Sequence, residues 1–393
     1  MTLSEFLIHI SDQALSNSKY YLQPGHNGPY NDSETLVRNY GHWLITFSKC
    51  FKLTGNKIYL NKITELAEYL ISKKSRPFGF SFNHRLKEGK DKCNGLIGQA
   101  WTFESLICAS SVIADKKYSE IAEDVFFQHN FNNEFGLWNI LETDGTILSI
   151  DNTFNHQLWF AACASLLNTP RQETIRNRIY LFLDFLLENI SVLDNGLIYH
   201  PIERPLNHNG LVHSIKSKLK KVTNTSIRFY WNKEKKSNHY NKEYNDKMLI
   251  KSVGYHQFNM YAFALLKESI PDHQFWKSSE FQMSVDYLIS GEFKEGLSDN
   301  IYGYPYNPPG FEVPYALSVL ANLSVDELVD ISSWWVNEQF KRCYNAETSM
   351  MDKNTEDPLT HTARIYEIIR LPISILERIE VNIQSIDDFA QIN

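Results

Sequence analysis

Residues 144–167, DGTILSIDNTFNHQLWFAACASLL, constrain the fold more than any other stretch of the sequence. They predict a turn, a short extended run and a helix, because apolar side chains recur at helical spacing from Phe154 onward. Apolar residues occupy most faces of this helix, so we expect it to be buried inside a larger assembly. Its entrance is polar, with Asn155, His156 and Gln157, and their burial costs free energy unless they are paired or face a cavity. The segment therefore predicts a ring of helices around a pocket.

The rest of the chain alternates between two kinds of expected helix, about twelve in all. One kind is apolar on most faces and rich in Ala, Gly, Trp and Tyr, whereas the other is amphipathic. The segments GQAWTF, HQLWFA and FNMYAF form a weak internal repeat that supports this alternation. Six helical hairpins that close on themselves give an all-α (α/α)6 toroid with short extended loop segments. The expected inner helices begin near Glu34, Asn94, Asn152, Gly254, Val313 and Thr360.

An open α-solenoid is the alternative architecture. A solenoid exposes amphipathic helices on both surfaces, and the expected inner helices are too apolar for that arrangement. A chain of 393 residues has room for two or three average domains or one large domain. We expect one toroid domain over residues 1–393, with an irregular insertion at about residues 194–251. Pro372 is expected to kink the last helix or to end its first half.

Charge and cysteine usage exclude several classes of protein. The net charge is −7 and the pI about 6.0, so no global basic field draws the chain to nucleic acid or to a membrane. The N-terminus has no basic and apolar regions of the signal-peptide type, and no apolar run approaches the ~18 residues of a membrane span. Five dispersed cysteines are typical of reduced, buried thiols, so we expect a cytoplasmic protein.

The segments GQAWTFESL, DNTFNHQLWFAA, GYHQFNMYAFALL, NPPGFEVPYAL and THTARIYEIIRLP together resemble the six-hairpin glycosidase-like superfamily. Within it, the chain is most similar to the AglQ-like proteins of glycan-assembly gene clusters. The resemblance covers most of the chain from about residue 94 to residue 371. It implies a toroid that acts on carbohydrate, and glycoside hydrolysis is the leading expected reaction. It does not settle that reaction, because relatives with this ring include hydrolases, lyases and sugar epimerases.

Two histidines are the leading candidates for general acid–base catalysis. His156 and His256 lie at the expected entrances of two inner helices. Histidine titrates near neutral pH, so it can accept or donate a proton at a sugar carbon or oxygen. With a tyrosine, this pair would suit a sugar epimerase or a uronate lyase. The alternative is that each is a hydrogen-bonded core histidine.

Three carboxylates are candidates for hydrolysis, which needs two acidic groups about 5–10 Å apart. Asp151 is one, although with Asn152 it is also placed to cap its helix. Glu104 lies well inside its helix, where a structural acid paired with an arginine is the alternative. Glu312 follows PPGF at a helix start, where the helix dipole is expected to keep its pKa low.

Sugar recognition needs rings for stacking and amides or charges for hydroxyl and acidic groups. Arg364 lies one turn after His361, and its guanidinium would suit a uronate or a sugar phosphate. A salt bridge from Arg364 to Glu104 or Glu367 is the alternative. The expected substrate is a carbohydrate, anionic or attached to a lipid. The expected substrate-binding residues are Gln99, Trp101, Asn155, Gln157, Tyr255, Asn259, Tyr304, Tyr315, His361 and Arg364.

Residues 211–251 combine many lysines with interleaved aromatic residues. This composition is typical of a solvated mobile loop, of a lid that attracts an anionic glycan, or of a nucleic-acid-binding segment. We expect no nucleic-acid partner, because the rest of the chain is acidic and carries no nucleic-acid motif. We also expect no metal and no cofactor, since HExxH, paired CxxC and phosphate-binding glycine loops are absent from the sequence. A non-catalytic toroid that binds glycan or acts as a scaffold is the remaining hypothesis.

Overall fold

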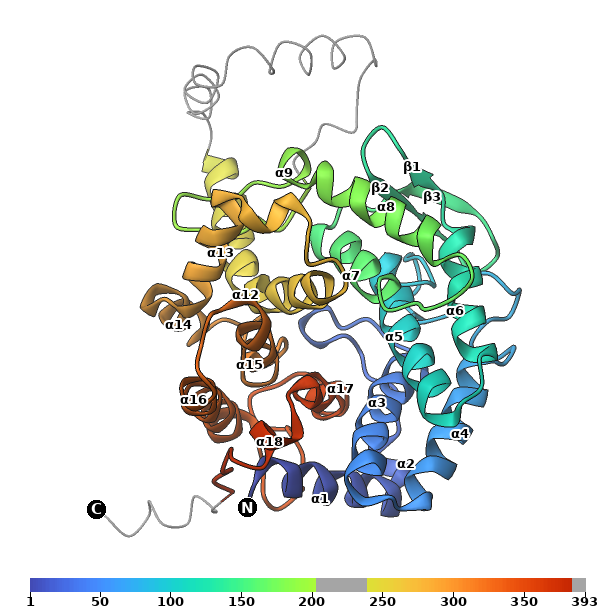
Figure 1. Ribbon diagram of the computed structural model, residues 1–393, viewed down its shortest axis with the longest axis vertical. Helices are drawn as coiled ribbons and strands as arrows, with labels where there is room; N and C mark the ends of the chain where they lie inside the picture. Colours follow the sequence, from blue (N-terminus) through green and yellow to red (C-terminus); the bar gives the residue numbers. More distant parts are fainter. Residues whose placement is uncertain (203–238, 384–393) are drawn as a thin grey trace.

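A computed structural model describes residues 1–202 and 239–383 of the chain. Nearly all of its regular structure is helical, as Figure 1 shows. The α-helices are α1 (Leu3–Ser16), α2 (Ser18–Tyr21), α3 (Val37–Thr54), α4 (Lys57–Ile71), α5 (Gly95–Ile113), α6 (Lys117–Gln128), α7 (Phe154–Ala164), α8 (Gln172–Asp184), α9 (Leu186–Asn189), α12 (His239–Ser269), α13 (Ser279–Ile289), α14 (Gly291–Leu297), α15 (Pro309–Leu320), α16 (Val325–Cys343), α17 (Pro358–Ala363) and α18 (Ile373–Leu376). Three short 3-10 helices are η1 (Gly28–Tyr30), η2 (Gln274–Lys277) and η3 (Arg364–Arg370).

The inner helices follow one another around a closed ring. Contacts run from α3 to α5, α7, α12 and α15, then to η3 and back to α3. Outer helices pack behind them, with α4 on α3, α6 on α5 and α16 on α15. In Figure 1 the colours pass once around the ring in chain order. The (α/α)6 toroid expected from the sequence is confirmed.

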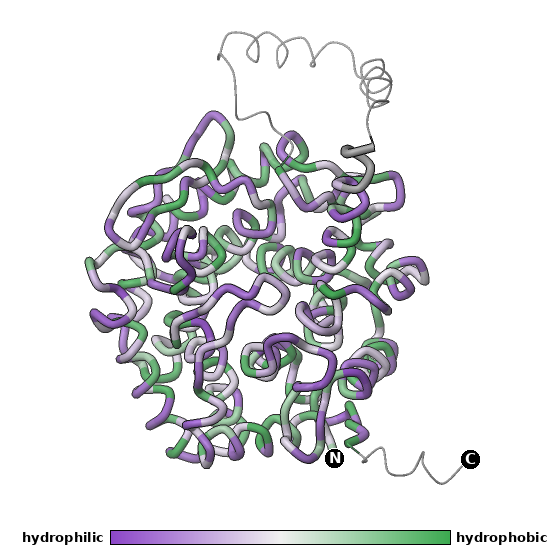
Figure 2. Tube along the Cα trace, turned by 180° about the vertical axis from the view of Figure 1, so that it is seen from behind, coloured by the Kyte–Doolittle hydropathy of each residue, from purple (hydrophilic) through white to green (hydrophobic). Residues whose placement is uncertain are grey.

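Burial explains why the inner helices are apolar on most faces. α7 is buried on nearly every face, and α5 and α15 are buried over most of their length. α5 is the one described helix with the length and composition of a membrane span, although we expected no such run. It lies between α3 and α7 in the ring, so the core of the fold accounts for its composition. Along the helices in Figure 2, hydrophobic and hydrophilic stretches alternate, as expected where each outer helix has one face in the core.

The two ends of the described chain are hydrogen-bonded to each other, which closes the ring. The backbone nitrogen of Leu3 donates to the carbonyl of Ile379 at 2.8 Å, and that of Val381 donates to the carbonyl of Met1 at 2.9 Å. Pro372 separates η3 from α18, so the predicted break in the last helix is confirmed. Proline cannot supply the backbone donor that would continue the helix.

Two features depart from the sequence predictions. The chain before α7 forms a small antiparallel sheet of β1 (Phe131–Asn132), β2 (Leu137–Leu141) and β3 (Ile147–Ile150), of which only the short extended run was expected. α12 begins at His239, well before the expected start at Gly254. Residues 239–251 are therefore helical, whereas we expected them to be irregular. The rest of the basic and aromatic segment, residues 211–238, lies outside the described residues. The hypotheses of a lid or a mobile loop concern this part of the chain, so they stay predictions.

Candidate functional site

A cavity of about 180 Å³ lies among the polar ends of the inner helices. This volume is below the ~300–1,000 Å³ of pockets for drug-sized ligands, so it suits a ligand of about one sugar ring. The lining residues are Asn27, Tyr30, Asp32, Arg38, Arg85, Lys90, Asn94, Ile97, Trp101, Thr153, Asn155, His156, His200, Lys251, Tyr255, Phe258, Tyr306, Asn307 and Arg364.

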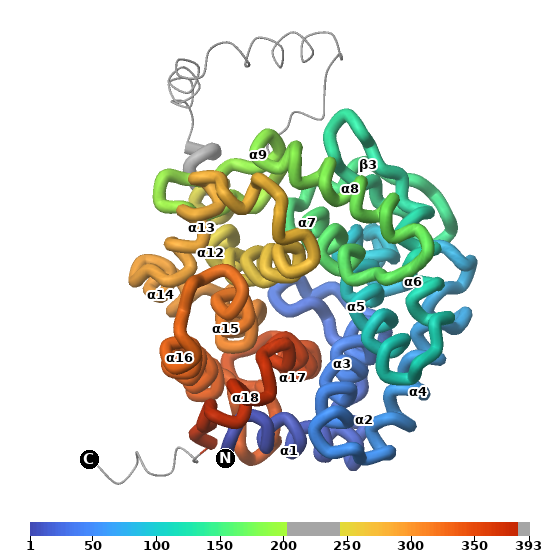
Figure 3. Tube along the Cα trace, viewed as in Figure 1, coloured from blue at the N-terminus to red at the C-terminus, as the bar shows by residue number. Residues whose placement is uncertain are grey.

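The loop between α2 and α3 supplies one wall of this cavity. Figure 3 shows it, in blue, running into the centre of the ring. The Asp357 carboxylate anchors this loop by accepting hydrogen bonds from the backbone nitrogens of His26 and Gly28, at 2.9 and 3.2 Å. Gly28 has a positive φ of 54°, and a Cβ there would collide with the ring of Tyr306. Glycine is therefore required where the loop passes over this tyrosine.

His156 lines the cavity and forms a pair with Asp151. Its Nδ1 lies 2.8 Å from an Asp151 oxygen, which also accepts the backbone N–H of Leu96 at 3.1 Å. The other Asp151 oxygen accepts the backbone N–H of Thr153 at 3.1 Å. Burial alone would raise the pKa of Asp151, but His156 and these backbone donors hold that pKa below its ordinary value. An ionised Asp151 keeps the imidazole proton on Nδ1 and leaves Nε2 as the basic nitrogen.

The capping role that we predicted for Asp151 and Asn152 is wrong in its details. The N-cap of α7 is Thr153, which makes no side-chain capping bond. Asp151 instead satisfies a donor in the first turn of α5, the neighbouring inner helix. One carboxylate thus connects the starts of two inner helices and orients the histidine between them.

His200 is a second histidine in the cavity wall, and the sequence analysis did not identify it. Its backbone lies beside the start of α7, since its carbonyl accepts the N–H of Phe154 at 3.4 Å. Its ring packs against Tyr255 with centroids 4.7 Å apart. Burial, followed by the nearby charges of Lys251 and His156, lowers the pKa of His200 well below its ordinary value. His200 is therefore neutral at physiological pH.

Several buried polar atoms in the wall have no hydrogen-bond partner among the described residues. They include Nη2 of Arg38, Oδ1 of Asn155 and Nδ1 of His200. Buried polar groups in folded proteins nearly always have partners, so donors and acceptors gathered around one cavity indicate a polar ligand. The Trp101 ring lies beside them, with the Arg38 guanidinium 4.0 Å from its centroid. Rings beside hydrogen-bonding groups are what sugar recognition requires.

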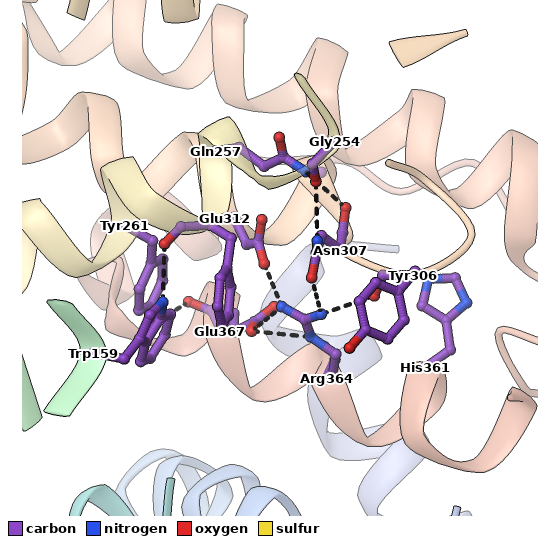
Figure 4. Close-up of polar contacts among 12 residues, drawn as sticks. Trp159, Gly254, Gln257, Tyr261, Tyr306, Asn307, Glu312, His361, Arg364 and Glu367 are labelled. Atoms are coloured by element: carbon purple, nitrogen blue, oxygen red, sulfur yellow. Dashed lines mark hydrogen bonds and ion pairs between the residues drawn. The ribbon is translucent and has the colours of Figure 1, made fainter. Parts of the chain in front are cut away.

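Arg364 also reaches the wall, but its guanidinium is already fully engaged, as Figure 4 shows. It donates to the carbonyl of Tyr306 at 2.8 Å and to the side chain of Asn307 at 2.7 Å. Its remaining donors face the carboxylates of Glu312 and Glu367. The alternative of a salt bridge to Glu367 is therefore what the structure shows, and a substrate acid has no spare donor on Arg364 to bind.

The expectation of a low pKa for Glu312 is wrong. Its carboxylate is fully buried and shares one guanidinium with Glu367. Burial, together with the like charge of Glu367, raises the pKa of Glu312 well above its ordinary value. These effects exceed the helix dipole on which the expectation depended.

The repeated glutamines hold loops, and neither lines the cavity. Gln99 accepts the N–H of Phe82 at 2.8 Å and donates to the carbonyls of Phe82 and Cys93 at 3.1 and 2.8 Å. Gln157 accepts the N–H of Trp138 at 2.9 Å and donates to its carbonyl at 2.8 Å. In the first two segments of the internal repeat, the glutamine therefore has the same structural role, which is to fix the chain that precedes its inner helix. We predicted that these two residues bind substrate, and their positions outside the cavity wall do not support that prediction.

His256 lies away from the cavity, although we expected it to pair with His156 there. Its Nε2 is 2.9 Å from the Ser284 carbonyl on α13, and its ring packs edge-on against Tyr287 and Phe293. Burial lowers the pKa of His256 to about 4. It therefore has the environment of a core histidine.

The remaining predicted residues divide between wall and core. Trp101, Asn155 and Tyr255 line the cavity. The others are buried outside its wall, and most have structural partners. Glu104 pairs with Arg370, Tyr315 donates to Glu268, Tyr304 packs on Trp335, His361 lies 3.1 Å from the carbonyl of Met351, and Asn259 has no side-chain partner among the described residues.

One group of residues in the described ranges has metal-binding geometry. Ligand atoms of Asp91, Cys93 and Glu142 lie within 4.8 Å of one another. Each carboxylate already accepts a backbone N–H, from Gly95 at 2.7 Å for Asp91 and from Lys92 at 2.8 Å for Glu142. Burial raises the pKa of the Cys93 thiol, which opposes the thiolate that a metal needs. The group therefore fits a loop anchor better than a metal site.

The sequence analysis missed most of the loop residues in the wall. Asn27, Tyr30 and Asp32 lie in QPGHNGPYND, which we treated only as a turn. The signal was available, because polar and aromatic residues concentrated in a loop between core helices are typical of a binding site. His200 and Lys251 lie in the segment that was expected to be irregular and carried no comparable signal.

Comparisons with known proteins agree with the ring. No family model matches the chain. Archaeal glycosylation protein Q of Haloferax volcanii is 37% identical over 372 residues, which are 94% of this chain and 97% of that protein.

Solved structures with low identity share the fold. D-mannose isomerase has a TM-score of 0.60 at 12% identity, over 93% of this chain and 95% of that one. Cellobiose 2-epimerase from Spirochaeta thermophila has a TM-score of 0.58 at 13% identity, over 94% and 96%. An inactive variant of the α-1,6-mannanase GH76A of Salegentibacter, in complex with α-1,6-mannotetrose, has a TM-score of 0.56 at 12% identity, over 94% and 98%. By its identity over nearly the whole length, the chain belongs to the family of archaeal glycosylation protein Q.

Proposed function

We propose that this protein is a carbohydrate-active enzyme that transfers a proton at a sugar carbon, as an epimerase or isomerase does. The observation that carries the proposal is the cavity wall around His156, where Asp151 fixes the tautomer of the imidazole and His200 lies close by as a second imidazole. Through Nε2, His156 would remove the proton from a carbon next to a carbonyl, and the imidazolium that forms would return this proton to the resulting enediolate. The relationship to a glycosylation protein supports a glycan or a glycan precursor as substrate.

Basic side chains in the wall support a negatively charged sugar. Two lysines and three arginines line the cavity, against one carboxylate, that of Asp32. Carboxylates behind the wall pair with the arginines, so a uronate or a sugar phosphate would match only a cation that these acids leave unpaired. The same inventory is compatible with a uronate lyase, which also begins by removing a proton from carbon.

Glycoside hydrolysis, the leading expectation from the sequence, is the second candidate because Asp32 places a carboxylate in the wall. Hydrolysis needs a second acidic group across the scissile bond. Both carboxylate oxygens of Asp32 lie 2.7 Å from the Nζ of Lys90, and the carboxylate of Asp151 is hydrogen-bonded to the Nδ1 of His156. The described part of the wall therefore offers a better acid–base pair for proton transfer at carbon than for hydrolysis.

Proton NMR in deuterated water separates these reactions. The full chain would be incubated with neutral hexoses, hexuronates and oligosaccharides. Exchange of one sugar C–H proton for deuterium, with an epimer or a keto sugar formed, is the expected result. Release of a reducing sugar without C–H exchange would show hydrolysis and overturn the proposal. The ultraviolet absorbance of an unsaturated uronate would show a lyase instead.

A further inference from the structure

The cationic side chains of the cavity wall differ in one respect, which is whether a carboxylate already faces them. Arg38 lies 3.1 Å from Glu34, and Arg364 faces Glu312 and Glu367. These carboxylates are buried with their arginines, so each arrangement is internally compensated.

The two cations on the loop before α5 also have partners. Lys90 lies 2.7 Å from Asp32, and Arg85 lies 3.5 Å from Asp91 and 4.0 Å from Asp32. Four of the five cations in the wall are thus matched by acids of the protein itself.

Lys251, on α12, is the exception. Within residues 1–202 and 239–383, no carboxylate forms an ion pair with its ammonium group. Its Nζ instead lies over three tyrosine rings, 5.0 Å from the centroid of Tyr30, 5.6 Å from Tyr255 and 5.9 Å from Tyr302. Such contacts stabilise the cation modestly but leave its N–H donors unused.

The helix itself directs Lys251 into the cavity. Lys251, Tyr255 and Phe258 all line the wall, and their spacing of four and three residues puts them on one face of α12. The hydroxyls of Tyr30 and Tyr255 lie 2.8 Å apart, so the rings around the ammonium are fixed to each other. Among the described residues, the lysine is thus held in place without a carboxylate that would neutralise it.

We propose that Lys251 is the specificity-determining residue that binds the negatively charged group of the substrate, a carboxylate of a uronate or a phosphate of a sugar phosphate. This inference rests on the proposed function, because it names the substrate class of the same cavity. An incoming anion would supply the missing partner through charge-assisted hydrogen bonds. Lys251 would therefore select acidic sugars, whereas Arg364, the residue expected from the sequence, holds the wall together.

The protonation state of Lys251 allows a second test, which is the pH dependence of anion binding. The titratable groups that face it are Lys90, His200 and the hydroxyls of Tyr30, Tyr255 and Tyr302. Burial, followed by the positive charge of Lys90, lowers the pKa of Lys251 to about 8. Its charge is present below that pH and lost above it, so the affinity for an anion should fall as the pH rises through about 8.

The test measures binding rather than turnover, by calorimetry on the full chain. The probes are D-glucuronate, D-glucose 1-phosphate and D-glucose, which separate a carboxylate from a phosphate and both from a neutral sugar. The wild type should bind at least one acidic probe more tightly than D-glucose. Lys251→Met should weaken that binding by at least about tenfold and leave the affinity for D-glucose unchanged.

Two further variants keep the result interpretable. Lys251→Arg should retain the preference for the acidic probe and remove its loss above pH 8, because arginine stays charged. Lys87→Met is the matched control, since Lys87 donates to the carbonyl of Asn31, next to the wall residue Tyr30, but does not itself line the cavity. It should bind all three probes as the wild type does.

The inference is overturned if the wild type shows no preference for either acidic probe. It is also overturned if Lys251→Met weakens all three probes equally, which is the result of a purely structural role. Failure of the proposed function has a different signature. In that case the acidic probe still binds through Lys251, but no C–H proton exchanges with solvent.

Discussion

One segment of α7 and one segment of α12 look alike in sequence and differ in the structure. Both contain a His-Gln pair, His156-Gln157 and His256-Gln257. α7 begins at Phe154, so His156 lies in its first turn, faces the cavity and keeps 20% of its side chain exposed. α12 begins at His239, so His256 lies several turns inside the helix and faces α13. The same dipeptide thus provides a candidate base in one helix and a packing residue in the other.

The difference teaches that the face of the helix, and not the His-Gln pair itself, decides which residue reaches the cavity; Phe258, which aligns with His156 in the internal repeat, lines it as well. On α12 the residue adjacent to His256, Tyr255, lines the wall together with Lys251. Successive residues on a helix point about 100° apart, so one position separates the cavity face from the outer face.

Replacing His156 should give the largest effect. His156→Gln removes the proposed proton acceptor but keeps a polar side chain at the cavity, so we expect turnover to fall by about 10²–10⁴-fold. The melting temperature should change little, because this side chain is partly exposed. Turnover assays paired with thermal denaturation check both statements. Unchanged turnover in the folded variant would remove His156 from the chemistry.

Asp151→Asn should have the next largest effect on turnover. The amide oxygen can accept from only one of the two N–H groups, of Leu96 and Thr153, that Asp151 accepts with separate oxygens, and the amide no longer favours the Nδ1–H tautomer of His156. We expect a loss of roughly tenfold to a thousandfold, less than the loss on removing the histidine itself. Asn152→Ala is the matched control, since Asn152 is the exposed neighbour of Asp151. Equal losses in both variants would show a general disturbance of the loop.

His256→Leu should change stability and leave turnover per folded molecule unchanged. The buried carbonyl of Ser284 loses its partner, which costs about 1–3 kcal/mol of unfolding free energy. Urea denaturation measures this cost. A loss of turnover without a loss of stability would contradict the structural role of His256.

The pH dependence of the same variant sharpens the comparison. The pKa of His256 is about 4 in the folded protein, below the ~6.5 of an unfolded chain, because burial disfavours the charged imidazole. Its contribution to stability is therefore complete above pH 6.5 and is lost as the pH falls towards 4. The stability gap between wild type and His256→Leu should narrow over this window by up to about 1.4 kcal/mol per pH unit. A gap that stays constant would contradict the neutral, buried state of His256.

The fold was more predictable from the sequence than the site. The ring followed from helices apolar on most faces, since only burial on all sides can explain a helix such as α7. The composition of the cavity wall depends on where helices begin and on where loops fold back towards the ring. Neither can be read from the pattern of residues in the sequence. Gln99 and Gln157 were predicted to bind substrate because a buried amide must have a partner, and that partner is the backbone of a preceding loop. His200 reaches the cavity only through tertiary contacts that no local pattern encodes. Lys251 shares a helix face with Tyr255 and Phe258 because α12 begins earlier than we predicted.

The proposed function places proton transfer in the cavity beside His156 and not at His256 in α12. Deuterium incorporation at a sugar carbon, followed by NMR for wild type, His156→Gln and His256→Leu in parallel, tests it most directly. We predict incorporation by the wild type and by folded His256→Leu, and none above background for His156→Gln. Incorporation that persists in His156→Gln and disappears in folded His256→Leu would contradict the account.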